Sequence, residues 1–163
     1  MKKVALTGHT GTVGSAILRE LQHYNFEVVG ISRSSGYDLT DEMDYQRAID
    51  DISTCDLFIN NGYIRQQQLL EDIWDRWQGD SGKQIITIGA LSTRIPSQML
   101  INTEYTKIKS RLSSTVFRLY DRGHWPRQTL VHAGLGPDMT WDFWANQLIC
   151  IIKNFPVLEI TLQ

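Results

Sequence analysis

Short apolar runs alternate along the chain with longer segments in which apolar residues recur every three or four positions. The runs are rich in β-branched residues and end at glycine or polar residues, which is typical of buried strands. The longer segments carry one apolar face, as Val13, Ile17 and Leu21 do, which predicts amphipathic helices. We expect Thr40 to supply the capping oxygen of the second helix. The expected strands are residues 4–7, 26–31, 56–60, 84–88, 128–132 and 157–162, and the expected helices are residues 13–23, 40–52, 66–77, 102–117 and 141–155.

This alternation of strands and helices predicts an α/β fold. Strands that are apolar on both faces and separated by helices form parallel sheets covered on both sides. The chain of 163 residues has the length of one domain. We therefore expect residues 1–163 to form a single domain with a three-layer, doubly wound parallel sheet, the Rossmann fold. Ligands of such sheets bind at the carboxyl ends of the strands.

Composition and charge narrow the classes of function. The net charge is −2 and no segment concentrates Lys and Arg, which argues against nucleic-acid binding. The four histidines show no metal-ligand spacing, and Cys55 and Cys150 are expected to be buried thiols in a reducing compartment. The longest apolar run, residues 148–152, is far shorter than a membrane span. We expect a cytoplasmic protein with no metal and no membrane association.

Three glycines follow the first expected strand at intervals of three residues. Gly8 permits a tight turn, Gly11 lets a diphosphate approach the backbone, and Gly14 lets the following helix pack against the sheet. The free amides at the start of that helix suit a phosphate. The pattern predicts a dinucleotide site, with a tight turn that binds no dinucleotide as the alternative. The residues expected to contact the dinucleotide here are Gly8, Thr10, Gly11, Thr12, Val13 and Gly14.

The end of the second expected strand indicates which dinucleotide would bind. NAD-binding domains usually carry Asp or Glu there to hold the ribose hydroxyls, but this strand is followed by Ser32, Arg33 and Ser34. The guanidinium of Arg33 can meet a 2′-phosphate, and the two serine hydroxyls can donate hydrogen bonds to it. We favour NADP(H) over NAD(H) as the cofactor, with a solvated loop arginine as the alternative.

Tyr105 and Lys109 stand four residues apart on an expected helix, so they lie on one face of it. A free phenol has a pKa of about 10 and is a poor acid or base at neutral pH. A neighbouring ammonium favours the phenolate and brings the phenol closer to working range. The same lysine can hold the ribose hydroxyls of a bound cofactor. The pair is therefore a candidate for acid/base chemistry.

Five segments together resemble the short-chain dehydrogenase/reductase superfamily, of which the chain looks like a short member. The segments are residues 7–14 (the glycine motif), 38–41 (the adenine contact), 60–62 (the strand end beside the cofactor), Tyr105 with Lys109 (the catalytic pair) and 133–134 with 137–139 (beside the nicotinamide). The resemblance implies further cofactor contacts by Asp38, Leu39, Asn60, Asn61, Gly62, Tyr105, Lys109 and Gly134.

The resemblance also implies the interconversion of a carbonyl and an alcohol, with hydride passing to or from the cofactor. Tyr105 would be the acid/base, Lys109 would tune its pKa and anchor the ribose, and a serine would polarise the carbonyl. The serine position falls on Ala90 when the strand is aligned, and on Ser92 when counted back from Tyr105. We expect Ser92 to fill this role, and Thr93 is an alternative hydroxyl.

Departures from the family pattern concern substrate binding. The segment between Asn61 and Gln84 is short, and no equivalent of the family's catalytic asparagine can be placed in it. Related sugar epimerases share the glycine spacing but are expected to need a sizeable C-terminal substrate domain. Two functions therefore stay open. One is an NADP(H)-dependent oxidoreductase acting on a small-molecule carbonyl or alcohol, and the other is an NADP(H)-binding sensor or interaction module with little or no catalysis.

The family resemblance also bears on assembly. Its members commonly pair the helices that here cover residues 66–77 and 102–117 across a dimer axis. Trp74 and Trp77 on the first of these helices would suit such an interface if they were exposed. We expect a homodimer or a higher homo-oligomer. The aromatic residues Trp141, Phe143 and Trp144 are interpreted as core or interface packing.

Overall fold

The computed structural model describes residues 2–93, 103–135, 138–154 and 158–162. The elements in these ranges alternate between strands and helices, as the apolar pattern predicts. In chain order they are β1 (Lys3–Thr7), α1 (Thr12–His23), β2 (Glu27–Ile31), η1 (Arg33–Ser35), α2 (Glu42–Ser53), β3 (Leu57–Asn60), α3 (Gln66–Trp77), β4 (Gln84–Ala90), η2 (Leu91–Thr93), α5 (Glu104–Arg122), β5 (Arg127–Ala133), α6 (Trp141–Asn154) and β6 (Glu159–Leu162).

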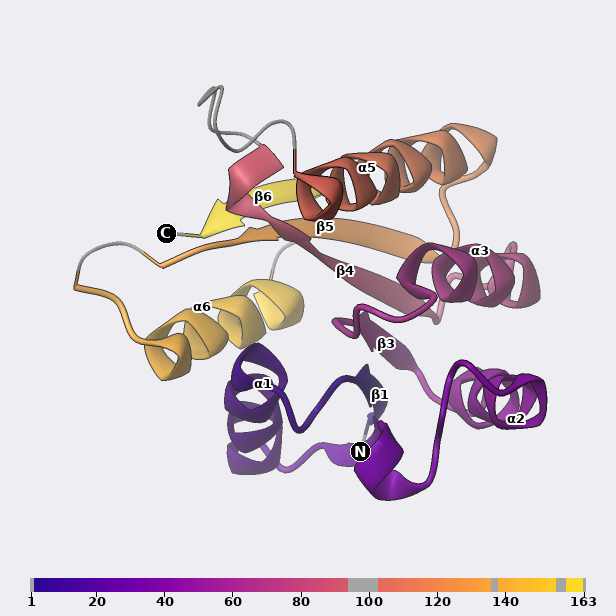
Figure 1. The fold of residues 1–163 in the computed structure, drawn as a ribbon, viewed down its shortest axis with the longest axis horizontal. Coiled ribbons are helices and arrows are strands. Elements are labelled where there is room, and N and C mark those ends of the chain that lie inside the picture. The colour runs from indigo at the N-terminus through magenta and orange to yellow at the C-terminus, as the bar shows by residue number, and fades with distance from the viewer. Residues whose placement is uncertain (1, 94–102, 136–137, 155–157, 163) are drawn as a thin grey trace.

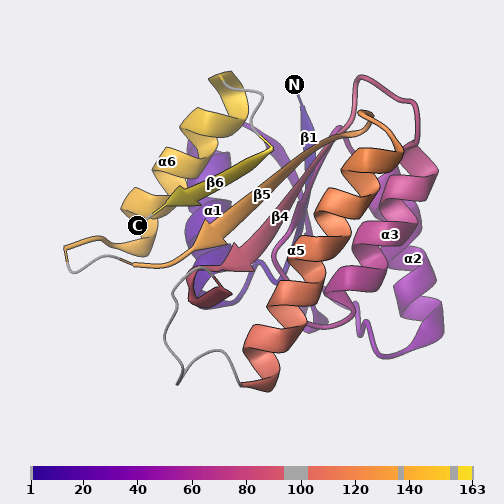
Figure 2. The same cartoon turned by 90° about the horizontal axis from the view of Figure 1, so that it is seen from above.

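The strands that the structure describes form one six-stranded sheet in the order β2-β1-β3-β4-β5-β6, and every neighbouring pair is parallel. The chain starts at β1, moves outward to β2 and then continues on the other side of β1, so the winding reverses between β1 and β3. Helices α1 and α6 cover one face of the sheet, and α2, α3 and α5 cover the other (Figures 1 and 2). The predicted three-layer, doubly wound parallel sheet is confirmed.

Two apolar cores, one on each face, hold the layers together. On one face α1 and α6 pack side by side over β1, β3 and β4, with Ile17, Leu21 and Trp144 fully buried. On the other face α2, α3 and α5 bury Tyr45 and Trp74 against the same strands. Strands buried on both faces explain why their sequences read as continuous apolar runs.

The ends of several elements differ from the sequence prediction. Strand β4 continues to Ala90, and α5 begins at Glu104 and continues to Arg122 rather than ending at residue 117. Residue 102 of the expected α5 range, residue 155 of the α6 range and residue 157 of the β6 range lie outside the described residues. The extension of α5 has a packing reason, since Leu119 in its last turns is fully buried.

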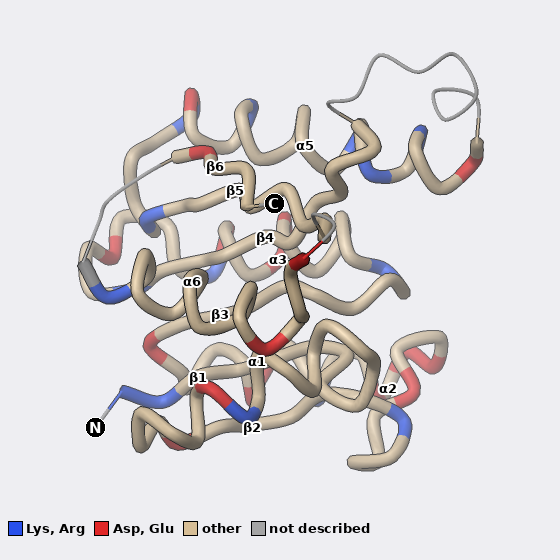
Figure 3. The backbone as a smooth tube through the Cα atoms, turned by 90° about the vertical axis from the view of Figure 1, so that its left-hand side faces the viewer, with Lys and Arg blue, Asp and Glu red and all other residues tan. Residues whose placement is uncertain are grey.

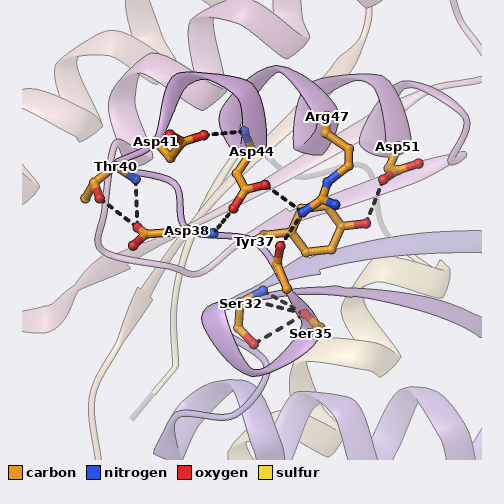
Figure 4. A network of polar contacts seen from close by, with 10 residues as sticks. Ser32, Ser35, Tyr37, Asp38, Thr40, Asp41, Asp44, Arg47 and Asp51 are labelled. Atoms are coloured by element: carbon orange, nitrogen blue, oxygen red, sulfur yellow. Dashed lines mark hydrogen bonds and ion pairs between the residues drawn. The ribbon is translucent and has the colours of Figure 1, made fainter.

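Asp41, and not Thr40, caps α2. The Asp41 carboxylate accepts a hydrogen bond from the amide of Asp44 at 3.0 Å. The Thr40 hydroxyl is already committed, because it donates to the Asp38 carboxylate at 2.7 Å (Figure 4). Both residue types are good caps, so the competing bond from Asp38 decides between them.

Both tryptophans of α3 are buried, which corrects the suggestion that they could form an exposed dimer interface. Trp74 is 0% exposed and Trp77 is 4% exposed, and both belong to the core beneath α3. Trp144 of α6 is buried as expected, whereas Phe143 is 54% exposed. The homodimer stays a prediction, and it would need contacts other than this tryptophan pair.

Charges are distributed as the sequence suggests, but only one of the two thiols is buried. Positions of Lys and Arg are interspersed with those of Asp and Glu along the tube of Figure 3. Cys55 is a buried free thiol, whereas Cys150 is only partly buried, against expectation. Among the described helices, none combines the length and apolarity that crossing a bilayer requires. The residues that the structure describes contain no cluster of three or more side chains suited to binding a metal ion.

The burial of Trp74 gives a test of the packing. We expect Trp74→Ala to lower the free energy of unfolding by about 3–5 kcal/mol, because it removes a large side chain from a closed core. Phe143→Ala, at an exposed aromatic position, should cost about 0.5 kcal/mol or less. Urea unfolding followed by far-UV circular dichroism measures both. Similar losses for the two variants would show that Trp74 is not a core residue.

Candidate functional site

A cavity of about 630 Å³ lies at the carboxyl ends of β1, β3, β4 and β5. This is the edge of the sheet where ligands of doubly wound folds bind, close to the point where the winding reverses. The cavity brings together residues that lie far apart in the chain, from Gly8 to Trp141. The predicted site residues that line it are Gly8, Gly11, Thr12, Val13, Gly14, Asn61, Gly62, Ser92, Tyr105, Lys109 and Gly134.

The glycines form a cradle at one side of this cavity. Gly8 has a φ of +65°, a conformation that L side chains rarely adopt. A Cβ on Gly14 would lie 2.0 Å from the carbonyl oxygen of Gly8, so only glycine fits there. A Cβ on Gly11 would lie 3.4 Å from the same oxygen, which is ordinary contact. Gly11 is also the N-cap of α1 and has no capping side chain, so the first-turn amides of α1 are available to a ligand anion.

The end of β3 is held against the glycine loop through Thr7. The Thr7 hydroxyl oxygen accepts hydrogen bonds from the amides of Asn61 at 2.9 Å and Gly62 at 2.8 Å. The Asn61 side chain donates back to the carbonyl of Thr7 at 3.2 Å. A Cβ on Gly62 would lie 3.1 Å from the Cβ of Thr7, so this position is tight. Thr7 and Asn61 thus fix the floor of the cavity.

Asn60 takes a different place from the one predicted. It is fully buried, and its side-chain amide donates to the backbone carbonyl of Gln66 at 2.8 Å. Neither cavity described in this section is lined by it. Asn60 therefore connects β3 to the start of α3, whereas its neighbours Asn61 and Gly62 line the cavity.

A second cavity of about 300 Å³ adjoins the first and shares Gly8, Gly62 and Tyr63 with it. Of the residues predicted to contact the cofactor, those that line it besides Gly8 and Gly62 are Ser32, Arg33, Asp38 and Leu39. Thr10 and Ser34 were also predicted to contact the cofactor, but both are exposed and neither lines a cavity described here. The Ser34 hydroxyl instead lies 2.8 Å from that of Ser32.

The charged pair of the second cavity is Arg33 with Asp38. Arg33 Nε lies 3.5 Å from a carboxylate oxygen of Asp38, and the Arg33 side chain is 72% exposed. Hydrogen bonds from Thr40 hold the pKa of Asp38 below its usual range, and Arg33 adds to this effect. Figure 4 shows the hydrogen bonds that connect Asp38 to Thr40 and to Asp44 of α2. The guanidinium is thus exposed at the edge of the cavity. Its ion pair with Asp38 is too exposed to solvent to contribute much to stability.

Tyr105 and Lys109 lie on the side of the cavity opposite the cradle, in the first two turns of α5. Tyr105 is 46% exposed, and its ring stacks on that of Tyr63 with 6.0 Å between the centroids. Lys109 is buried, and its Nζ lies 5.8 Å from the centroid of the Tyr105 ring. The helix places both side chains on one face, as their spacing predicts.

The ionisation of this pair differs from the expectation. Burial, with a smaller contribution from Tyr63, raises the pKa of Tyr105 instead of lowering it. Burial also lowers the pKa of Lys109 to about 8. The ammonium does not reach the phenol oxygen, because it donates hydrogen bonds to Gln66 Oε1 at 2.7 Å and to the carbonyl of Ile88 at 3.0 Å.

Two hydroxyls near the pair are distinguished by their contacts. Ser92 lines the cavity, and its buried Oγ has no hydrogen-bond partner among the residues that the structure describes. The Thr93 hydroxyl donates to the carbonyl of Ala90 at 2.7 Å and lies 3.3 Å from Nδ1 of His132. Ser92 therefore lines the same cavity as Tyr105 and Lys109, whereas the Thr93 hydroxyl is bound to the end of β4.

Sequence reasoning missed three residues that build the site. Thr7 holds the floor, Tyr63 stacks on Tyr105, and Gln66 binds the Lys109 ammonium. For Gln66 a signal was present, since residues 66, 69, 70, 73 and 77 share the buried face of α3. A glutamine on an otherwise apolar face must find buried hydrogen-bond partners. Thr7 stands at the start of the glycine motif of residues 7–14, whereas Tyr63 has no comparable signal.

A glycine cradle at the start of a helix, at the switch point of a parallel sheet, defines a Rossmann-type fold with a nucleotide site. A family model described as the NAD dependent epimerase/dehydratase family matches residues 4–132. The chain therefore belongs to the NAD-dependent epimerase/dehydratase family, and its fold is that of solved short-chain dehydrogenases. Epimerases, which were distinguished from this chain on its sequence, are thus named in the description of the matching family. No curated protein matches the chain.

Solved structures agree on the fold. A short-chain dehydrogenase from Streptomyces avermitilis superposes with a TM-score of 0.78 at 12% identity, covering 100% of this chain and 89% of that one. A short-chain dehydrogenase from Sphingobium yanoikuyae in complex with NADPH has a TM-score of 0.77 at 14% identity, with coverages of 99% and 87%. A Brucella ovis oxidoreductase of the same family, in complex with a partially ordered NAD, has a TM-score of 0.72 at 14% identity and covers 99% of each chain.

The two inner glycines of the cradle give a matched pair of variants. Gly14→Ala should destabilise the fold by about 1–3 kcal/mol, because its methyl group would overlap a backbone carbonyl. Gly11→Ala should leave the fold almost unchanged, since its methyl group makes only ordinary contact, but should weaken dinucleotide binding where the diphosphate approaches. Thermal unfolding and titration with NADPH measure the two effects. Equal loss of stability in both variants would contradict this account of the cradle.

Proposed function

We propose that residues 1–163 form one dinucleotide-binding domain that acts as an NADP(H)-dependent oxidoreductase and interconverts a carbonyl and an alcohol. The observation that carries this proposal is that one cavity is lined both by the glycine cradle and by Ser92, Tyr105 and Lys109. A binding site for the cofactor and a set of groups able to move a proton therefore face the same space. The substrate is a small molecule.

The residues present fit a dinucleotide. Gly11 lines the cavity and carries no side chain that would keep a ligand from the backbone, and the uncapped amides of α1 suit a diphosphate. The two adjoining cavities share Gly8, Gly62 and Tyr63, which gives an extended ligand a continuous path. The adenosine end would lie against Ser32 and Arg33, and the nicotinamide end would lie near Tyr105.

When bound, the nicotinamide supplies or accepts the hydride. The side chains handle the proton. In the reducing direction Tyr105 gives its hydroxyl proton to the carbonyl oxygen, and in the oxidising direction it removes the proton from the alcohol. Ser92 donates a hydrogen bond to the same oxygen. The Lys109 charge favours the phenolate that Tyr105 becomes after giving up its proton.

A second candidate, an NADP(H)-binding sensor or interaction module with little catalysis, is favoured by one observation. Burial raises the pKa of Tyr105 above its ordinary value. A phenol with a raised pKa is a weaker acid at neutral pH, which slows proton transfer. A measurement of turnover distinguishes the two functions, because both require cofactor binding but only the oxidoreductase requires Tyr105.

Tyr105→Phe tests the enzyme against the sensor. The variant keeps the ring and loses the proton, so NADPH oxidation with a panel of small carbonyl compounds should fall by about 10²- to 10⁴-fold. NADPH affinity, measured by fluorescence titration, should change little. Tyr120→Phe on the same helix is the control and should retain full turnover. A wild-type protein that binds NADPH tightly but turns over no carbonyl compound would favour the sensor.

Arg33→Ala tests the choice of cofactor. Loss of a charge-assisted contact to the 2′-phosphate should weaken NADPH binding by about ten- to a hundredfold. NADH lacks that phosphate, so its affinity should change much less. Isothermal titration calorimetry with both nucleotides measures the difference, and Arg19→Ala, which removes an exposed arginine of α1, is the control. Equal losses for the two nucleotides would refute the preference for NADP(H).

A further inference from the structure

The ammonium of Lys109 is buried with neutral partners. The residue is 4% exposed, and its Nζ donates to Gln66 Oε1 at 2.7 Å and to the Ile88 carbonyl at 3.0 Å. No carboxylate among the described residues forms an ion pair with it. An ammonium has three N–H donors, so one is left to face the cavity that Lys109 lines.

The side-chain amide of Gln66 is fixed in one orientation. Its Nε2 donates to the carbonyl of Asn60 at 2.7 Å and to that of Ile88 at 3.1 Å. Turning the amide over would set its oxygen against two carbonyls and its NH₂ group against the ammonium. Gln66 Oε1 must therefore face Lys109. Since Asn60 ends β3 and Ile88 belongs to β4, the orientation is set by the ends of two strands.

The backbone before Gln66 also helps to direct the Gln66 side chain toward Lys109. Arg65 precedes it with a φ of 49°, in the left-handed region that residues other than glycine seldom adopt. Two contacts hold Arg65 there, an ion pair with Glu42 at 2.8 Å and a cation–π contact with Tyr45 at 4.6 Å. Such a conformation persists when its surroundings enforce it. The turn directs the first side chain of α3 inward, toward Lys109.

We propose that Gln66 is a positioning residue for the reaction, whose amide holds the Lys109 ammonium beside Tyr105 with its charge intact. The inference rests on the proposed function. A glutamate of the same shape would form a buried ion pair and cancel the field that Lys109 exerts on the phenol. The neutral oxygens of Gln66 and Ile88 fix the position of the ammonium and leave its charge to act on Tyr105 and on a bound ribose.

Gln66→Glu tests this directly, with Gln67→Glu as the matched control. Gln67 is the next residue of α3 and is exposed, so the control adds the same charge outside the site. In the full chain, without substrate, the rate at which acetic anhydride modifies Lys109 is followed by mass spectrometry from about pH 6 to about pH 11. The midpoint should lie at about 8 in the wild type. It should rise by about one unit or more in Gln66→Glu, because a carboxylate favours the ammonium, and stay unchanged in Gln67→Glu.

Gln66→Met is the second variant, since it keeps a side chain of similar volume and removes the acceptor. Without that acceptor the charged form loses a hydrogen bond, so the midpoint should fall below that of the wild type. Thermal unfolding identifies which variants are folded. If Gln66→Glu does not fold, the Lys109 midpoint in Gln66→Met tests the proposal. A wild-type midpoint near the ordinary value of about 10.4, or an unchanged midpoint in a folded Gln66 variant, would overturn the proposal.

The titration needs no substrate, so its outcome is separate from that of the oxidoreductase proposal. If the wild type lacks turnover but the Lys109 midpoint shifts as expected, Gln66 holds Lys109 and the proposed reaction fails. If the wild type is active, turnover of Gln66→Glu should fall at least tenfold, with a shifted pH profile. Full turnover with an unchanged profile would overturn the positioning role.

Discussion

The close approach of Gly14 to the carbonyl oxygen of Gly8 is the constraint on which the rest of the site depends. A Cβ at residue 14 would lie only 2.0 Å from that oxygen, so the loop after β1 must turn directly into α1. The start of α1 is thereby brought to the point where the winding of the sheet reverses. From there the helix packs along α6, and Thr7 ties the loop to the end of β3. The glycine cradle, the floor that Thr7 and Asn61 fix, and the side formed by Tyr105 and Lys109 thus enclose one cavity.

Much of the fold could be predicted because strands and helices bury their faces with different periods. The bounds of α3 follow from its apolar spacing alone, and the strands were each found within a few residues. Contacts from distant elements decide the remaining ends. Helix α5 continues past residue 117 because Leu119 is buried and Arg118 pairs with Glu71 of α3, and neither contact is visible from local sequence.

The candidate site was predictable where the chemistry of a residue type is specific and local. Gly8 and Gly14 stand out because only glycine tolerates their positions, Gly11 because it lies three residues from both, and Tyr105 with Lys109 because helical spacing places them on one face. Asn60 was predicted to contact the cofactor, but the amide at a strand end can point either to a ligand or to the next helix, and here it binds the backbone of Gln66. Trp74 and Trp77 were considered as a dimer interface because members of the family commonly pair these helices. The apolar face of α3 already predicts that both are buried.

Lys109 shows how the fold and the proposed chemistry make opposing demands. Burying an ammonium without a carboxylate disfavours its charged form, which is why its pKa falls to about 8. A neighbouring carboxylate would relieve that penalty and would also remove the charge from the phenol. Two neutral oxygens, from Gln66 and Ile88, are a compromise between these demands. Because the Asn60 side chain binds the Gln66 backbone and the Asn60 carbonyl binds the Gln66 amide, the contacts that begin α3 also fix the ammonium opposite the glycine cradle.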